Sequence, residues 1–160
     1  MDLKKVIETR RSIRSYQPRD IAPDVLKRIL AATVAAPTGS DEQTWHLYLV
    51  RSPEGRERLG TEGTTQRFIK DAPVIVACAA KKRHRTDAII AVDHLVLAAR
   101  NEGIGTCWVG YFDGAKVKEI LGVPTDEEVV MLIPMGYPAD QDAFCNKEPR
   151  ARIEDVCTEK

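Results

Sequence analysis

The amino-acid sequence predicts a single α+β domain, in which about four strands form a sheet and the helices are segregated from it. Two continuous apolar runs, residues 73–80 and 129–135, are typical of strands that are buried on both faces. Between them, residues 86–101 show the apolar spacing of a long helix. A chain of 160 residues can bury such a core without disulfides, so one domain over residues 1–160 is expected.

Two helices and a strand are expected in the first third of the chain. Asp2 can cap a short helix that runs to about Glu8. Pro23 suits the first turn of a second helix, which carries apolar residues at helical spacing and ends near Pro37. The run Trp-His-Leu-Tyr-Leu-Val-Arg at residues 45–51 predicts a strand.

The segment after this strand is expected to hold less regular structure. Pro53 and Gly60 bracket a short helix. Residues 56–70 are hydrophilic and contain glycines, so we expect this segment to be mobile.

The strongest predicted helix begins at Thr86 and Asp87, runs to about Asn101 and ends at Gly103. Apolar residues occupy most of its circumference and leave little polar face. A helix of this kind is buried on several sides, and in a chain this small a second subunit is an expected source of that cover.

The last third of the chain adds two strands and a helix. Residues 106–109 and 129–135 predict the strands. Asp113 can cap the helix between them, and Gly122 ends it. Residues 139–160 form a polar tail that carries two arginines.

Composition and charge argue against several classes of function. The chain has 24 Lys and Arg and 24 Asp and Glu, and a formal net charge of zero disfavours binding to nucleic acid or to a membrane. The cysteines form no C-x-x-C pair and the histidines have no ligand-type spacing, so no metal site is expected. The first residues lack a signal-peptide core and no apolar stretch could span a bilayer, so a cytoplasmic location is expected by default.

A cluster of basic residues near the N-terminus is a candidate anion site. Arg10, Arg11 and Arg14 lie close together with Ser12 among them, and residues 9–19 contain no acid. Guanidinium groups present planar forks of donors that suit phosphate oxygens, and the serine hydroxyl adds another donor. A solvated basic turn or surface ion pairs would have the same spacing.

Five segments resemble, in the same order, the motifs of the FMN-dependent nitroreductases. The first is the Arg-Arg-Ser-Ile-Arg-Ser-Tyr stretch, and the five together are residues 10–16, 36–45, 103–110, 134–138 and 150–156. In the second motif Asp41 stands where the family has asparagine, and Thr44 where it has proline. The five motifs are spread in the family's order along nearly the whole chain, and together they are specific for the family.

The resemblance implies a nitroreductase-like fold, with a central, mostly antiparallel sheet flanked by helices. It also implies an intertwined homodimer that binds FMN at its interface. Relatives often carry extra helices over the substrate where this chain has residues 56–70. That segment is short by family standards, which would leave the pocket open.

The same resemblance assigns roles to the cofactor-binding residues of the two terminal motifs. Arg10, Arg11 and Ser12 would hold the phosphate end of FMN, and Arg150 would return to the phosphate from the C-terminal motif. Arg14 would lie near flavin N1 and O2, where a fixed cation stabilises the negative charge of the reduced flavin. Arg14 as a purely structural ion-pair partner is the alternative.

The remaining site residues come from two further loops. The backbone around Gly110 and Tyr111 would lie against flavin N5, which makes Gly110, with Arg14, a candidate catalytic residue, although Gly110 would also suit a simple turn. The other subunit would contribute the loop with Pro37, Thr38, Gly39 and Asp41. An ionised aspartate only accepts hydrogen bonds, so Asp41 could accept from flavin N3–H, turn to solvent, or serve as a turn former.

The sequence therefore predicts an FMN-dependent oxidoreductase that passes hydride from NAD(P)H through flavin N5 to a nitroaromatic, a quinone or a similar electrophile. Its partners would be NAD(P)H, a small electron acceptor and a second copy of the chain. A flavin-binding store or sensor with little turnover is the first alternative. Dehalogenation or ene reduction on the same fold, and a phosphate-binding α/β module without flavin, are the others.

Overall fold

Four antiparallel strands form the sheet at the centre of the computed structural model, which describes residues 1–145 and 150–160. The strand order is β1-β2-β4-β3, and each neighbouring pair runs antiparallel. The strands are β1 (Trp45–Val50), β2 (Val74–Ala80), β3 (Gly105–Thr106) and β4 (Glu128–Gly136). The predicted α+β class with about four strands is confirmed for the described residues.

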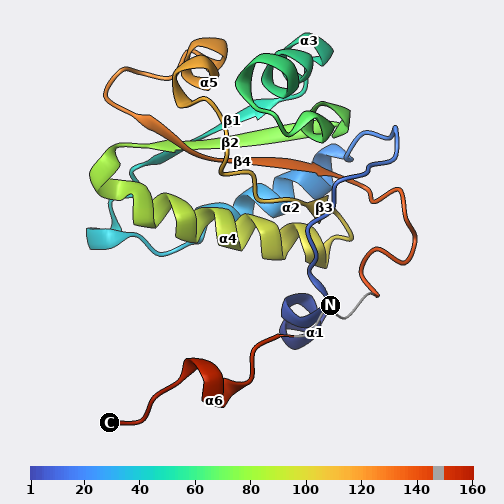
Figure 1. Ribbon diagram of the computed structural model, residues 1–160, viewed down its shortest axis with the longest axis vertical. Coiled ribbons are helices and arrows are strands. Elements are labelled where there is room, and N and C mark those ends of the chain that lie inside the picture. The colour runs from blue at the N-terminus through green and yellow to red at the C-terminus, as the bar shows by residue number, and fades with distance from the viewer. Residues whose placement is uncertain (146–149) are drawn as a thin grey trace.

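Helices cover both faces of this sheet (Figure 1). The α-helices are α1 (Leu3–Thr9), α2 (Pro23–Val34), α3 (Pro53–Arg58), α4 (Arg85–Asn101), α5 (Gly114–Leu121) and α6 (Ile153–Val156). Short helical turns are η1 (Gly39–Asp41), η2 (Leu59–Gly63), η3 (Arg67–Asp71) and η4 (Lys82–His84). α2 and α4 lie against one face and α3 and α5 over the other, while α1 and α6 lie outside these layers on the α4 side.

Strand β2 is the centre of the core, because neighbouring residues face opposite helix layers. Val74, Val76 and Cys78 belong to the cluster that contains α2 and α4, whereas Ile75 and Ala77 belong to the cluster that contains α5. All residues of β2 are at most 1% exposed. The predicted strand with two buried faces is confirmed, and the alternation follows from the two-residue period of a strand.

The long helix α4 ends as its sequence predicts, with Gly103 in the left-handed region at φ 76°. It packs on the sheet and on α2, but Ile90, His94 and Leu97 are only half-buried in this chain. That partial cover is compatible with the expected second subunit. No α-helix among the described residues has the length and apolar character that a membrane crossing requires.

Residues 56–70 do not form the mobile segment that their composition predicts. The segment folds as the end of α3 followed by η2 and η3, and Leu59 and Ile69 are fully buried. The Arg56 Nη1 atom donates to the carbonyls of Lys70 and Ala72 at 3.0 and 2.9 Å. The prediction is wrong because a hydrophilic side chain here binds backbone carbonyls instead of facing water.

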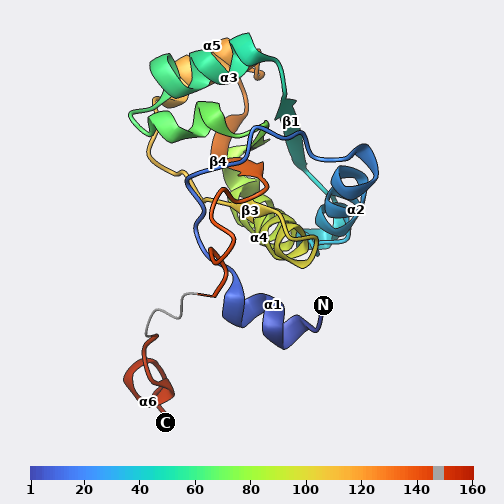
Figure 2. The same ribbon diagram turned by 90° about the vertical axis from the view of Figure 1, so that its right-hand side faces the viewer.

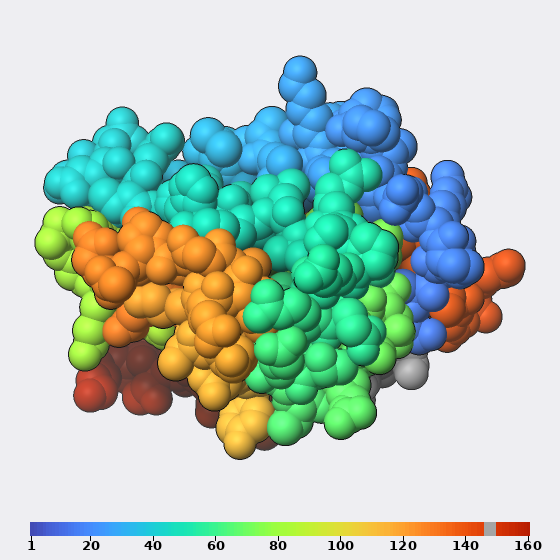
Figure 3. Space-filling view, turned by 90° about the horizontal axis from the view of Figure 1, so that it is seen from above, coloured from blue at the N-terminus to red at the C-terminus, as the bar shows by residue number. Residues whose placement is uncertain are grey.

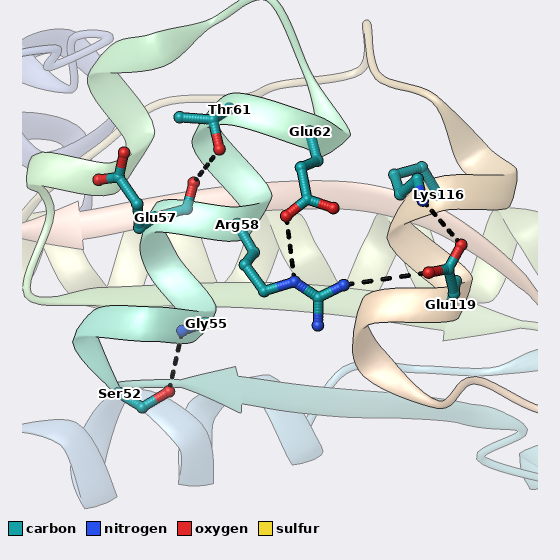
Figure 4. A network of polar contacts seen from close by, with 8 residues as sticks. All are labelled: Ser52, Gly55, Glu57, Arg58, Thr61, Glu62, Lys116 and Glu119. Atoms are coloured by element: carbon teal, nitrogen blue, oxygen red, sulfur yellow. Dashed lines mark hydrogen bonds and ion pairs between the residues drawn. The ribbon is translucent and has the colours of Figure 1, made fainter.

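An ion pair joins this same segment to α5 (Figure 4). The Arg58 guanidinium lies 3.1 Å from Glu62 and 4.0 Å from Glu119, and Lys116 lies 2.9 Å from the same Glu119 carboxylate. In Figure 3 the green surface of this segment lies directly against the orange surface of α5. The α3–η2 segment and α5 therefore form one continuous outer layer.

Three details of the secondary structure differ from the sequence prediction. The strand expected at residues 106–109 is only two residues long, and beyond it the chain contacts β4 through a hydrogen bond from the Cys107 N–H to the Pro134 carbonyl and an isolated Val109–Leu132 bridge. Asp2 precedes α1 without forming a side-chain cap, whereas Asp113 caps α5 by accepting the Lys116 N–H at 3.0 Å. The polar tail at residues 139–160 contains the helix α6, which the sequence did not predict. Residues 146–149 of this tail lie outside the described residues.

Candidate functional site

The arginine loop, residues 10–15, runs beside the short strand β3. Ser12 forms a parallel bridge with Thr106, and the Ile13 N–H donates to the Thr106 carbonyl at 2.8 Å. A Cβ atom on Gly105 would lie 2.7 Å from Ile13 Cγ1, so glycine permits this close approach. Ile13 is buried while the residues on either side of it are exposed, as strand-like alternation requires.

The arginine loop forms one wall of a cavity of about 470 Å³. Residues after β4 form the opposite wall. The Ala139 N–H donates to the Ser15 carbonyl at 3.0 Å and so holds these residues beside the arginine loop. The Gln17 N–H likewise donates to the Tyr137 carbonyl at 2.9 Å, so the two segments run side by side (Figure 2). Five of the predicted site residues line this one cavity: Arg10, Arg11, Ser12, Arg14 and Arg150.

The guanidinium groups around the cavity are short of carboxylate partners. In the described part of the chain, no ion pair joins Arg10, Arg14 or Arg150 to an acidic side chain. Arg11 differs, because its Nη1 atom donates to the carbonyls of Glu8 and Arg10 at 3.0 and 2.8 Å and so caps the end of α1. Asp140 also lines the cavity, but Arg10, Arg14 and Arg150 form no ion pair with it, so these three guanidinium groups fit a bound phosphate group.

Two buried groups lie within the electrostatic influence of Arg14. The Tyr16 hydroxyl donates to the Ile13 carbonyl at 2.7 Å, and burial raises the Tyr16 pKa far above its usual range. Burial also raises the pKa of the Cys107 thiol, although the positive charge of Arg14 acts in the opposite direction. Both groups stay protonated at neutral pH, so Tyr16 is a core residue, and the arginines provide the formal positive charge of the cavity wall.

A second group of predicted site residues lies in a loop with unusual backbone geometry. Ser40, Asp41 and Gln43 have φ values of 53°, 57° and 47°, a region that few residues other than glycine adopt. The Gln43 N–H donates to Thr38 Oγ1 at 3.1 Å and helps to hold this conformation. The Asp41 side chain is exposed, so its contact with flavin stays a prediction. The predicted site residues here are Pro37, Thr38, Gly39 and Asp41.

This loop lies far from the arginine cavity of the same chain. The Gly39 N–H donates to Asp87 Oδ1 at 3.2 Å, and Asp87 is in the first turn of α4. Near the other end of α4, the Arg100 Nε donates at 3.0 Å to the Oγ1 atom of Thr9, which directly precedes the arginine loop. Thirteen helical residues separate Asp87 from Arg100, which places the two contacts about 20 Å apart. One chain therefore does not bring the two groups of site residues together.

Gly110 and Tyr111 lie beyond β3, on a third part of the surface. Gly110 is exposed, and its N–H makes no hydrogen bond to the residues that the structure describes. A Cβ atom there would meet only Met131, at an ordinary 3.6 Å, so the backbone does not require glycine for its conformation. The side chain of Tyr111 is 76% exposed and borders a separate cavity of about 390 Å³.

Arg100 is a residue that sequence reasoning missed. It is 7% exposed, and its guanidinium carbon lies 4.0 Å from the centre of the Phe144 ring. Through Phe144 and its hydrogen bond to Thr9, it joins the two chain segments that form the cavity walls. A signal was available, because Arg100 falls four residues after the buried Val96 and hence on the buried face of the helix.

The fold and the site define an α+β protein with an arginine-lined cavity. A family model described as "Putative TM nitroreductase" matches residues 2–160. The chain belongs to the nitroreductase family, so the predicted family and its oxidoreductase class are confirmed.

Individual relatives resemble the chain over nearly its whole length. A protein of Archaeoglobus fulgidus named "Putative NADH dehydrogenase/NAD(P)H nitroreductase" is 32% identical over 168 residues, which cover 98% of this chain and 97% of that protein. "FMN reductase (NADPH)" of Bacillus subtilis is 25% identical over 178 residues, 92% of this chain and 70% of that protein. The solved structure of an FMN-dependent nitroreductase from Clostridium difficile has a TM-score of 0.86 at 26% identity, over 98% of this chain and 99% of that one.

Proposed function

We propose that this chain is an FMN-dependent NAD(P)H oxidoreductase whose electron acceptor is a nitroaromatic, a quinone or a similar electrophile. The cavity that Arg10, Arg14 and Arg150 share is the observation that supports it most strongly. A flavin mononucleotide offers one phosphate group to such a cavity, and relatives of the chain carry FMN and NADPH in their names. When bound, FMN supplies hydride acceptance and donation at its N5 atom.

The residues of the cavity suit different parts of this cofactor. Arg10, Arg150 and the Ser12 hydroxyl bind the phosphate, while Arg11 holds the end of α1 in place and adds its charge. Arg14 is the fixed cation that stabilises negative charge on the reduced flavin. The N–H of Gly110, which has no hydrogen-bond partner among the described residues, is available as a donor to N5.

A complete site in this proposal needs two chains. The loop with Asp41 is held at Asp87 and the arginine loop near Arg100, about 20 Å further along α4, so in this proposal the Asp41 loop contacts the flavin of a partner. Apolar side chains of α1 and α6 support this arrangement, because they are 56–73% exposed in the single chain. They are Leu3, Ile7, Ile153 and Val156.

Absorption spectroscopy and steady-state kinetics test the proposal. The purified protein, supplemented with FMN, should show a flavin spectrum and oxidise NADH or NADPH in the presence of menadione or nitrofurazone. A yellow protein that dithionite reduces but neither nicotinamide does would indicate a flavin store or sensor. A colourless protein that takes up no FMN would indicate a phosphate-binding module instead.

A further inference from the structure

The backbone at Gly110 is held on one side by strand β4. The Val109 N–H donates to the Leu132 carbonyl at 3.0 Å, and the Leu132 N–H donates to the Val109 carbonyl at 3.1 Å. In a trans peptide the carbonyl and the following N–H point in opposite directions, and all described peptides are trans. The bond to the Val109 carbonyl therefore turns the Gly110 N–H away from β4, toward the outside of the sheet.

On its other side, the same stretch of chain is held by the segment around η2. The Thr64 hydroxyl donates to the Tyr111 carbonyl at 2.7 Å, and the Asp113 N–H donates to the Gly63 carbonyl at 2.8 Å. Gly110 and the Tyr111 N–H thus form a short bridge between two anchored points. Of the two contacts on the η2 side, only the one from Thr64 uses a side chain.

Thr64 is itself well placed to be a rigid anchor. It is 8% exposed, and its Oγ1 also accepts the Gln66 N–H at 3.2 Å, which fixes the direction of the hydroxyl. The neighbouring Gly63 packs so closely on α5 that a Cβ atom would lie 2.9 Å from Val117 Cγ2. The ion pair between Arg58 and Glu119, shown in Figure 4, also joins the end of α3 to α5.

We infer that Thr64 is a positioning residue for the reaction, because its hydroxyl holds the Gly110–Tyr111 backbone at the orientation in which it meets flavin N5. This inference rests on the proposed function, which places that backbone against the flavin. Thr64 acts through the Tyr111 carbonyl and needs no contact with the cofactor or the substrate. The segment that its composition marks as mobile thus supports the reacting centre from behind.

Paired substitutions at position 64 test this role. Thr64→Val removes the hydroxyl at nearly constant volume, and Thr64→Ala removes it without adding a methyl group in case the valine variant fails to fold. Thr64→Ser keeps the hydroxyl and should restore the behaviour of the native protein. The matched control is Thr61→Val, because the Thr61 hydroxyl also donates to a backbone carbonyl, that of Glu57 at 2.8 Å, but does not touch the Gly110–Tyr111 stretch.

Two measurements report on the inference, and one of them needs no activity. Amide hydrogen exchange at Asp113, whose N–H donates to the Gly63 carbonyl, should become about three- to tenfold faster in Thr64→Val, with or without FMN, because the neighbouring hydrogen bond from Thr64 to the Tyr111 carbonyl is lost. In the FMN-loaded protein, kcat for NADPH oxidation should fall by a similar factor while the Kd for FMN stays unchanged. The retained Kd is expected because Thr64 does not line the phosphate cavity.

The outcomes separate this inference from the function on which it rests. Native exchange and native kcat in Thr64→Val and Thr64→Ala would overturn the role of Thr64, as would an equal effect of Thr61→Val or a failure of Thr64→Ser to restore both values. A native protein that takes up no FMN would overturn the proposed function and this role with it. A flavin-loaded, active native protein with an unaffected Thr64→Val variant would overturn the role alone.

Discussion

The four arginines around the cavity have different neighbours, so their substitutions are not equivalent. Arg10, Arg14 and Arg150 have no carboxylate partner in the described part of the chain, whereas Arg11 already binds two carbonyls of its own loop. The energy that Arg14 or Arg150 gives to a bound anion is therefore not offset by breaking an existing ion pair. Replacing Arg11 would also loosen the end of α1.

We expect Arg14→Ala and Arg150→Ala each to weaken FMN binding. One charge-assisted hydrogen bond contributes about 1.5–3 kcal/mol, which corresponds to a loss of about tenfold or more in affinity. The measurement is the Kd for FMN by fluorescence titration, with Arg51→Ala as the control because Arg51 is exposed and forms no ion pair within the described residues. An unchanged Kd in both cavity variants would contradict the phosphate assignment.

A second residue-scale prediction concerns the buried thiol of Cys78. Burial, followed by the charge of Glu127, raises the pKa of Cys78 to about 12. In the unfolded chain the thiol ionises near its ordinary pKa of about 8.5, so its stabilising contribution is present below that pH and is lost as the pH rises above it. Stability should therefore decrease between pH 8.5 and 9.5 with a contribution from Cys78 that approaches about 1.4 kcal/mol per pH unit.

Urea unfolding at several pH values measures this contribution. Cys78→Ala should show a shallower decrease in the free energy of unfolding over that interval, because no buried thiol is left to stay protonated. Cys157→Ala removes an exposed thiol and should leave the slope as it is in the native chain. Equal slopes in all three proteins would disprove the assignment.

At the scale of elements, α4 connects the two separate groups of site residues. Asp87 holds the loop before β1 at one end, and Arg100 holds Thr9 and the Phe144 ring near the other. Desolvation lowers the pKa of Arg100, and among the described residues no carboxylate pairs with it. Its role is to join the two walls of the cavity from behind, as a fixed structural cation.

Replacing Arg100 should therefore affect FMN binding without removing a cavity residue. In Arg100→Met we expect the free energy of unfolding to fall by about 1–3 kcal/mol, because a hydrogen bond and a cation–π contact are lost. The Kd for FMN should rise in the same variant, while Arg100→Lys should keep part of both. Denaturant unfolding and flavin titration check these values, and a destabilised variant with native FMN affinity would show that the walls do not depend on Arg100.

The sequence predicts correctly those strands and helices that are marked by an apolar run, a cap or a terminal glycine. The apolar runs of β2 and β4 and the capped or glycine-ended helices α4 and α5 are found where their residues indicate. The segment from Arg56 to Lys70 is wrongly predicted, because its order comes from the carbonyl contacts of Arg56 and from the ion pair that Arg58 forms with Glu119, far away in sequence. Strand β3 is shorter than predicted because, among the described residues, the chain beyond Thr106 bonds to β4 only through Cys107 and Val109 and forms no continuous ladder.

For the whole molecule, some residues of the candidate site could be predicted from the sequence and others could not. Arg10, Arg11 and Arg14 are recognisable because they lie within five residues and match a family motif. The structure places them in one cavity with Arg150. Thr64 and Arg100 could not be selected, because an isolated threonine or arginine acquires its role only from a tertiary contact. The separation of Asp41 from the cavity is likewise a property of the length of α4.

The length of α4 has a consequence for dimers that combine two different inactive variants. If each active centre takes its arginines from one chain and its Asp41 loop from the other, complementation should occur between two inactive variants. One would be the Arg14→Ala/Arg150→Ala double variant, and the other Gly39→Pro, which lacks the N–H that binds Asp87. A heterodimer of the two contains one intact centre and one doubly damaged centre.

Random pairing at equal amounts makes half of the dimers mixed, so co-expression should restore activity in about a quarter of all centres. Each variant expressed alone should have almost none, and subunits mixed without exchange serve as the control. A co-expressed sample that stays inactive would mean that each chain builds its own centre. Restored activity would instead show that the rigid helix α4, by keeping the two groups of site residues apart, makes every active centre depend on both chains.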